Sequence, residues 1–229
     1  MPDPFLPGNP PIPLILRRSA QAKRISLRIS QLDGRVTLTL PKRLKEAEGI
    51  AFAREKEEWI RKHLEARGAD IPIGIGAEFP LGGRMVQVIQ GQGRRVQLGV
   101  DTIAVPGRED RVPVRLAAHL KELARDRLAG ACDDYAAALG RPYSKLTLRD
   151  TRSRWGSCTS DGGLMFSWRL ILTPPEVLDY VAAHEVAHLA QMNHSPAFWA
   201  EVERIYGPYK DARRWLRQNG SDLHRYRFN

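Results

Sequence analysis

The sequence predicts an α+β protein, with a β-rich N-terminal module carrying one helix and a C-terminal half that contains several helices and a small antiparallel sheet. Apolar residues alternate at period two in short segments of the first 110 residues, and they recur at helical spacing in longer segments after them. Glycines and prolines separate these segments. The chain has 229 residues, of which 42% are hydrophobic and 27% charged, a composition typical of a globular protein with one large or two small domains.

Residues 1–16 are rich in proline and are expected to form an extended arm. Their apolar patch precedes Arg17 and Arg18, which is the reverse of the order in a secretory signal peptide. No stretch approaches the roughly 20 apolar residues that span a bilayer. These observations predict a cytoplasmic protein that has no membrane partner.

Residues 17–110 are expected to form the β-rich module. Alternating apolar residues over 24–40, interrupted by an Asp-Gly turn, predict a β-hairpin. Residues 44–67 predict one charged amphipathic helix, and glycine-punctuated short strands are expected from there to Val105.

Residues 111–229 are expected to form the second domain. Leucines recur at helical spacing over 113–139, between a proline and a glycine that are typical of helix ends, so a long helix is expected there. Three short strands follow, then a helix from Pro175 to Met192 and two further helices.

The strongest chemical signal is a group of histidines on the helix that begins at Pro175. His184 and His188 are four residues apart, so both imidazoles lie on one face of a helix and can reach one metal ion. Glu185 projects about 100° away from His184, which places its carboxylate beside the ion, where it can take a proton from the attacking water. His194 follows the helix and is a candidate third ligand. Three nitrogen ligands leave one position open, as in catalytic zinc sites, and predict one Zn²⁺ ion per chain.

Histidines that only satisfy hydrogen bonds in a core are the alternative interpretation. It leaves unexplained why three of the six histidines lie within eleven residues. The other three, His63, His119 and His224, are expected in solvent. The two cysteines form no CxxC pair, so a zinc site in this chain depends on histidine.

Arg152 and Arg154 are candidate substrate-binding residues that would hold an oxyanion or a substrate carboxylate near the metal. The alternative is that they pair with Asp150 and Asp161. Cys158 is expected to be buried in a strand as a small apolar residue, with a nucleophile or a thiolate that plugs the metal as alternatives.

The strand expected at residues 164–168 is a candidate edge on which an extended peptide could pair, and an interior strand of the sheet is the equal alternative. Aromatic residues after His194 recur at helical spacing. They are expected to pack as core and hold the His194 turn in place rather than line a cleft.

Four stretches of the sequence resemble the YgjP-like metallopeptidases, which are related to the SprT-like zinc proteases. These stretches are residues 150–158, 166–172 and 184–199, with an extension over 24–64. The resemblance covers nearly the whole chain. It implies a minimal zincin-like catalytic domain behind the β-rich N-terminal module.

The resemblance also implies roles for individual residues. His184, His188 and His194 match the metal ligands of the family, and Glu185 matches its catalytic carboxylate. The third histidine has the spacing found in metzincins, but Gln191 stands where those proteins have a turn glycine. This departure argues against membership of the metzincins.

A zinc-dependent metallopeptidase that acts on a peptide or protein substrate is therefore the predicted function. One alternative is a metal-dependent nucleoside triphosphate pyrophosphohydrolase that uses the same site, since an activated water can also attack phosphorus. Another is a DNA-associated, SprT-like protease, because the chain carries a net charge of +10 concentrated in residues 17–67 and 204–227. No nucleic-acid motif is present in the sequence, and no pattern predicts the oligomeric state.

Overall fold

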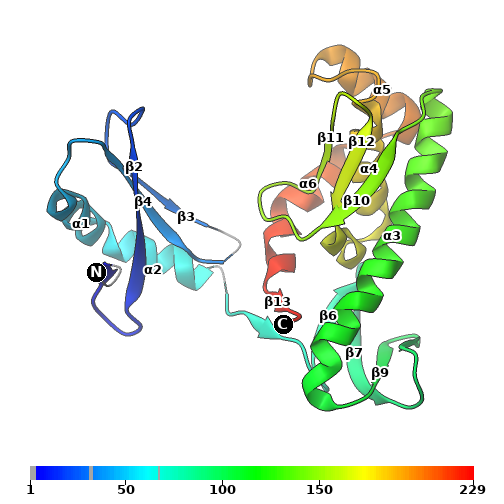
Figure 1. The fold of residues 1–229 in the computed structure, drawn as a ribbon, viewed down its shortest axis with the longest axis horizontal. Helices are drawn as coiled ribbons and strands as arrows, with labels where there is room; N and C mark the ends of the chain where they lie inside the picture. The colour runs from blue at the N-terminus through cyan, green and yellow to red at the C-terminus, as the bar shows by residue number, and fades with distance from the viewer. Residues whose placement is uncertain (1–3, 31–32, 67) are drawn as a thin grey trace. The chain divides into compact units, whose positions relative to one another are not determined.

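Two hydrophobic cores divide the chain into two units, Met1–Asp70 and Ile71–Asn229. The computed structural model describes residues 4–30, 33–66 and 68–229. Both units combine helices with strands, so the predicted α+β class is confirmed (Figure 1). None of the helices in these ranges combines the length and the apolar character that crossing a bilayer requires.

A four-stranded sheet, in the order β1-β2-β4-β3, forms the first unit. Its strands are β1 (Phe5–Leu6), β2 (Ile12–Ser19), β3 (Ser26–Ile29) and β4 (Val36–Pro41). The predicted hairpin is confirmed because β3 and β4 pair antiparallel, whereas β2 pairs parallel with β4. Val36, Leu38 and Leu40 are buried in alternation along β4, so one face of the sheet is apolar.

The extended arm expected at residues 1–16 is wrong for its described part. Strand β1 and the first half of β2 lie in this range and pair with each other in the sheet. Ile12 and Leu14 are buried in the core of the unit. Alternate side chains of the apolar patch point into the core. Burying them in the sheet is more favourable than leaving them exposed to water in an extended arm.

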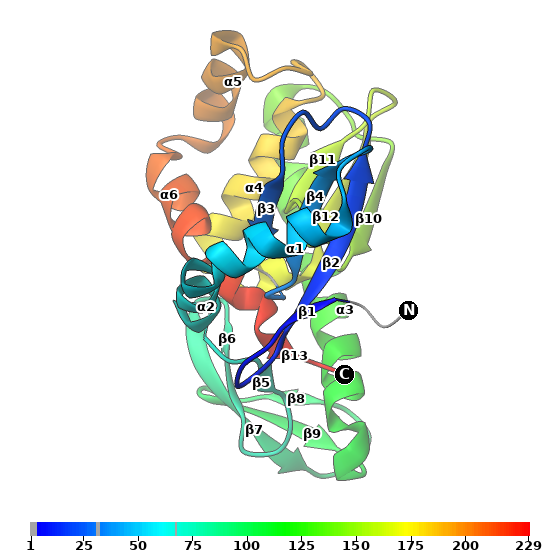
Figure 2. The same cartoon turned by 90° about the vertical axis from the view of Figure 1, so that its left-hand side faces the viewer.

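Helices α1 (Glu46–Glu55) and α2 (Glu57–Ala66) cover the apolar face of this sheet, and α1 crosses in front of β2 and β4 in Figure 2. A Cβ atom on Gly49 would lie 2.5 Å from a methyl group of Leu40, so the glycine permits this close approach. The single helix expected over 44–67 is interrupted at Lys56. Its amide donates to the carbonyls of both Phe52 and Ala53, which tightens the turn there.

The domain boundary expected after residue 110 lies instead after Asp70. A second four-stranded sheet, in the order β6-β7-β9-β8, buries its inner face against the long helix α3 (Val112–Leu139) in one core. A sheet with one apolar face needs a covering layer, so these strands belong with the helix. The strands of this segment are β5 (Ile71–Pro72), β6 (Glu78–Leu81), β7 (Arg84–Gly91), β8 (Gln97–Leu98) and β9 (Thr102–Pro106).

Helix α3 follows the short 3₁₀ helix η1 (Glu109–Arg111) and confirms the long helix predicted from leucine spacing. Leu116, Leu120 and Leu128 are fully buried along one side of it. The helix ends at Gly140, whose φ of 74° is a conformation that favours glycine. The helix that carries two of the histidines packs against α3.

The remaining elements follow α3 in the chain and include helix α4, which carries two of the histidines. They are β10 (Lys145–Arg149), β11 (Gly156–Cys158), β12 (Gly163–Ser167), η2 (Trp168–Leu172), α4 (Pro175–Ala187), α5 (Pro196–Tyr206), α6 (Lys210–Asn219), η3 (Gly220–His224) and β13 (Tyr226–Arg227). Strand β13 pairs parallel with β5 and so joins the two ends of the second unit.

The three-stranded sheet beside α4 has the order β10-β12-β11 and is mixed rather than wholly antiparallel as expected. Strands β11 and β12 form an antiparallel hairpin, but β10 pairs parallel with β12. The chain between β10 and β11 crosses to the far side of β12, which leaves β10 and β12 pointing the same way.

Helix α4 begins at Pro175 as expected but ends at Ala187, five residues before the expected end at Met192. The amides of Leu189 and Ala190 bond to carbonyls three residues back, so the chain tightens and leaves the helix. The turn that carries His194 starts at this point.

Candidate metal centre

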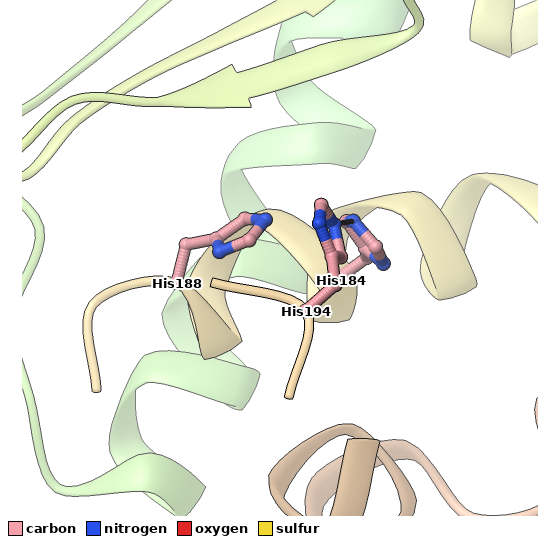
Figure 3. A group of neighbouring side chains, drawn as sticks. All are labelled: His184, His188 and His194. Atoms are coloured by element: carbon pink, nitrogen blue, oxygen red, sulfur yellow. Dashed lines mark hydrogen bonds between the residues drawn. The ribbon is translucent and has the colours of Figure 1, made fainter. Parts of the chain in front are cut away.

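The structure brings His184, His188 and His194 together at the end of helix α4 (Figure 3). His184 lies in the last turn of α4, His188 caps it, and His194 lies in the loop before α5. One ring nitrogen from each residue lies within 4.8 Å of the others. The Nε2 atoms of His184 and His194 are 3.1 Å apart.

These distances fit the donor set of a metal ion. Zinc–nitrogen bonds of about 2.0–2.1 Å place two imidazole nitrogens of a tetrahedral site about 3.3 Å apart. The pair formed by His184 and His194 is close to this separation. His188 is buried whereas His194 is exposed, so the group opens to solvent on the His194 side.

The ring of His188 is held by the turn that follows it. Its Nδ1 atom lies 2.9 Å from the backbone carbonyl of Gln191, which accepts a hydrogen bond from that nitrogen and leaves Nε2 as the ligand atom. No described non-glycine residue has a positive φ, so Gln191 needs no glycine-like backbone at this turn. This explains how the chain reaches His194 without the turn glycine of the metzincins.

Aromatic side chains from helix α5 pack against the histidines, as expected. Phe198 is fully buried and stacks on His188 with ring centroids 4.4 Å apart. Its edge-on contacts with His184 and His194 are 4.9 Å each. Ser195 caps helix α5 by accepting the amide of Phe198, so the cap fixes the ring against all three imidazoles.

Burial favours the neutral form of two of these histidines, His184 and His188. It lowers the pKa of His184 to about 3, and the positive charges that His188 and His194 would carry lower it further. Burial also lowers the pKa of His188, although the Gln191 carbonyl opposes the shift. Neutral imidazoles are the form that binds a metal ion.

Glu185 lies beside this group, with only 6% of its surface exposed. Burial raises the pKa of its carboxyl to about 7, and the charge of Arg154 pulls that pKa back. A Cβ atom on Gly156 would lie 2.5 Å from Cγ of Glu185, so strand β11 runs directly against the carboxylate side chain. The sequence analysis did not predict this close approach of Gly156 to Glu185.

A cavity of about 480 Å³ joins these groups. Arg154 and Cys158 line it together with Glu185 and the three histidines. Burial, followed by the charges of Glu185 and Asp161, raises the pKa of the Cys158 thiol to about 11, so it is a neutral thiol at neutral pH.

The two candidate arginines differ in their position relative to the cavity. Arg154 is exposed and lines the cavity, whereas Arg152 is not among its lining residues. The charge of Arg152 instead contributes to lowering the pKa of His224. Of the two, only Arg154 lines this cavity.

Asp150 pairs with a residue that the sequence analysis did not single out. Arg169 donates to both oxygens of Asp150, at 2.7 and 3.2 Å. It also donates to the carbonyls of Leu223 and Tyr226, so one buried guanidinium joins the β10–β11 loop to the C-terminal segment. The available sequence signal was the position of Arg169 as the one charged residue in the apolar run of residues 168–172, which indicates a buried charge with a specific partner.

The edge strand beside the cavity is β11. Strand β12, which contains most of the expected edge at residues 164–168, lies between β10 and β11 and is therefore interior. Each residue of β11 lines the cavity, and within the described chain its far side carries no paired strand.

Histidines spaced along a helix end, with a buried carboxylate in the same cavity, are features of the metallopeptidase class. The model of the YgjP-like family, described as "YgjP-like, metallopeptidase domain", matches residues 23–219. The chain therefore belongs to the YgjP-like metallopeptidases, a family of metal-dependent hydrolases of peptide or protein substrates.

The crystal structure of the metallopeptidase zymogen of Pyrococcus abyssi abylysin is similar over 40% of this chain and 93% of its own, with 20% identity and a TM-score of 0.36. No curated protein matches the chain.

Proposed function

We propose that this protein is a zinc-dependent metallopeptidase in which His184, His188 and His194 hold the ion and Glu185 is the general base. The observation that carries the proposal is the convergence of three imidazole nitrogens within 4.8 Å, in a cavity that Glu185 also lines. Imidazole ligands suit zinc, and three of them leave a coordination position for water or substrate.

A zinc ion bound there would polarise the scissile carbonyl and lower the pKa of water toward neutrality. The chain's own part in the reaction is proton transfer. Glu185 accepts the proton of the attacking water and passes it to the leaving amine. The close approach of Gly156 restricts where the carboxylate can lie, which keeps the acceptor oxygen in the cavity.

An extended peptide would bind along strand β11. Edge strands offer unpaired amides and carbonyls to a peptide in the same way as they do to another strand. Arg154 lies at the same cavity and would hold a substrate carboxylate or a developing oxyanion.

The substitution Glu185→Gln tests the proposal because it keeps the shape of the side chain and removes the proton acceptor. The expected result is unchanged metal content and a loss of kcat of about 10²-fold or more. Glu203→Gln, an exposed change on helix α5, is the matched control and should leave kcat unaltered.

Unfolded proteins and nucleoside triphosphates should be offered side by side to each variant. Peptide hydrolysis that is lost in Glu185→Gln supports the proposal. Full peptidase activity in that variant would show that Glu185 is not the base. A signal lost only for nucleoside triphosphates would show that the substrate class is wrong.

A further inference from the structure

Charge is unevenly distributed in the first unit. Residues 4–45, which contain all four strands, carry nine Lys and Arg residues and one Asp. Residues 46–66, which form helices α1 and α2, carry four Lys and Arg residues and six Glu. The sheet and its loops are therefore strongly basic, whereas the helices are slightly acidic.

The helices cover only one face of the sheet. The inward residues of β2, β3 and β4 pack with Ala53 and Ile60 of the helices in one core. Strand register places the alternate residues on the opposite face. We call this the open sheet face and define it by Phe5, Ile15, Arg17, Arg28, Thr37 and Thr39.

The open sheet face presents cations around a row of hydroxyl groups. Arg17 lies opposite Thr39, and Arg28 lies opposite Thr37 on the other side of β4. Both arginines are exposed, and neither forms an ion pair with a carboxylate in the described chain. Their backbone positions are about 12 Å apart from strand spacing and rise, so they can contact separate anionic groups.

Apolar side chains complete the same face. Phe5 is 57% exposed and Ile15 is 41% exposed, although both belong to regular strands. An exposed aromatic ring on the same sheet face as these arginines offers a stacking surface in addition to positive charge.

We propose that the open sheet face binds a single-stranded nucleic acid. Arg17 and Arg28 contact phosphates, the threonine hydroxyls bond to sugar or base edges, and bases stack on Phe5. Every nucleotide supplies one negative charge and one flat apolar surface, which are the two features that this face complements. RNA and DNA share this chemistry.

A duplex fits the same face poorly. The major groove is about 12 Å wide and admits one helix or a two-stranded ribbon, whereas this sheet has four strands about 4.8 Å apart. An acidic peptide would satisfy the arginines but offers no flat surface to Phe5. The two basic side chains and hydroxyls at the centre of the face also differ from the apolar centre of a membrane-binding surface.

Fluorescence anisotropy of the full chain with labelled oligo(dT) and oligo(U) of about 20 nucleotides tests the proposal. The double substitution Arg17→Gln/Arg28→Gln should weaken binding by about tenfold or more, and it should reduce the slope of log K against log salt by about 1.4. Phe5→Ser should weaken binding about fivefold with little change in that slope. The preference between oligo(dT) and oligo(U) distinguishes DNA from RNA.

The matched control is Arg54→Gln/Lys62→Gln, which removes two exposed charges from the helix side of the same unit. It should weaken binding by less than about threefold, because these charges lie away from the contacted face. An equal loss in both double variants would show that only net charge matters and would overturn the proposal.

Three other results would also overturn it. They are the absence of binding to single strands at low salt, tighter binding to a duplex of equal length, and displacement of oligo(dT) by polyglutamate at equal charge concentration. Photocrosslinking of a halogenated oligonucleotide to the unchanged protein gives a second measurement that needs no variant. Crosslinks on β1 or β2 support the proposal, and crosslinks confined to residues 71–229 contradict it.

Discussion

The two units of the chain place their charged and polar groups in opposite ways. The second unit buries Glu185 and His188, which are 6% and 8% exposed, whereas the first unit sets Arg17 and Arg28 on an exposed face. Neighbouring atoms fix the position and the pKa of a buried group, so small changes around it have large effects. Salt screens the interactions of exposed cations, so removing one of them changes stability or binding only modestly. We therefore expect single substitutions to have large effects at the buried positions of the second unit and small effects at the exposed positions of the first unit.

The largest combined effect on stability and activity is expected for Gly156→Ala in the second unit. The added methyl group meets Glu185 at a distance that nonbonded carbon atoms do not adopt, so the strand or the carboxylate has to move. We expect the free energy of unfolding to fall by about 1–3 kcal/mol and kcat to fall at least about tenfold. Urea unfolding and steady-state kinetics measure the two changes.

Gly130→Ala on helix α3 is the matched control. Nothing lies within 4 Å of the added atom, and alanine is favoured over glycine inside a helix by about 0.5–1 kcal/mol. This variant should be as stable as the wild type or more so. Equal losses in both variants would mean that the contact between Gly156 and Glu185 has no special role.

A smaller effect is expected from His224, which lies at the C-terminal segment. It is 4% exposed, so the expectation of a solvated side chain is wrong. Burial, followed by the charge of Arg169, lowers its pKa from 6.5 to about 4, and the charge of Asp150 opposes this shift. The apolar side chain of Trp155 covers the ring, with centroids 5.3 Å apart.

The unfolded chain therefore binds a proton at His224 more tightly than the folded protein does. Protonation between pH 6.5 and about 4 favours unfolding, so the free energy of unfolding falls as the pH falls through this range. The variant His224→Gln should show a shallower decrease over the same range. Identical pH profiles for the two proteins would contradict the buried neutral histidine.

The smallest effect is expected for Arg28→Gln in the first unit. The side chain is exposed on β3 and takes part in no ion pair in the described chain, so its removal should change the free energy of unfolding by less than about 0.5 kcal/mol. Thermal unfolding in low and high salt measures this change. A loss above about 1 kcal/mol would show that the open sheet face is part of a packed interface.

Local sequence patterns predicted the elements whose cause is local. The spacing of His184 and His188 follows from the pitch of a helix, and alternation along β4 follows from the period of a strand. The convergence with His194 was an expectation from spacing and resemblance, and the structure brings the three rings together.

Features that depend on distant contacts could not be predicted in this way. The end of α4 depends on the turn in which the Gln191 carbonyl meets the His188 ring. The boundary after Asp70 depends on which helix covers the strands from β6 to β9, and hydrophobic periodicity does not identify that partner. The close approach of Gly156 to Glu185 joins segments 29 residues apart, and a single glycine in a sequence does not indicate what approaches it.

Metal stoichiometry is the most direct test of the central claim, that three imidazoles hold one ion. Elemental analysis after dialysis should find one zinc ion per chain in the wild type and in His119→Ala, whose histidine lies on α3 outside the cluster. His194→Ala should retain zinc much more weakly and lose it during dialysis. Full zinc occupancy in His194→Ala, or an active wild-type protein without metal, would contradict the account.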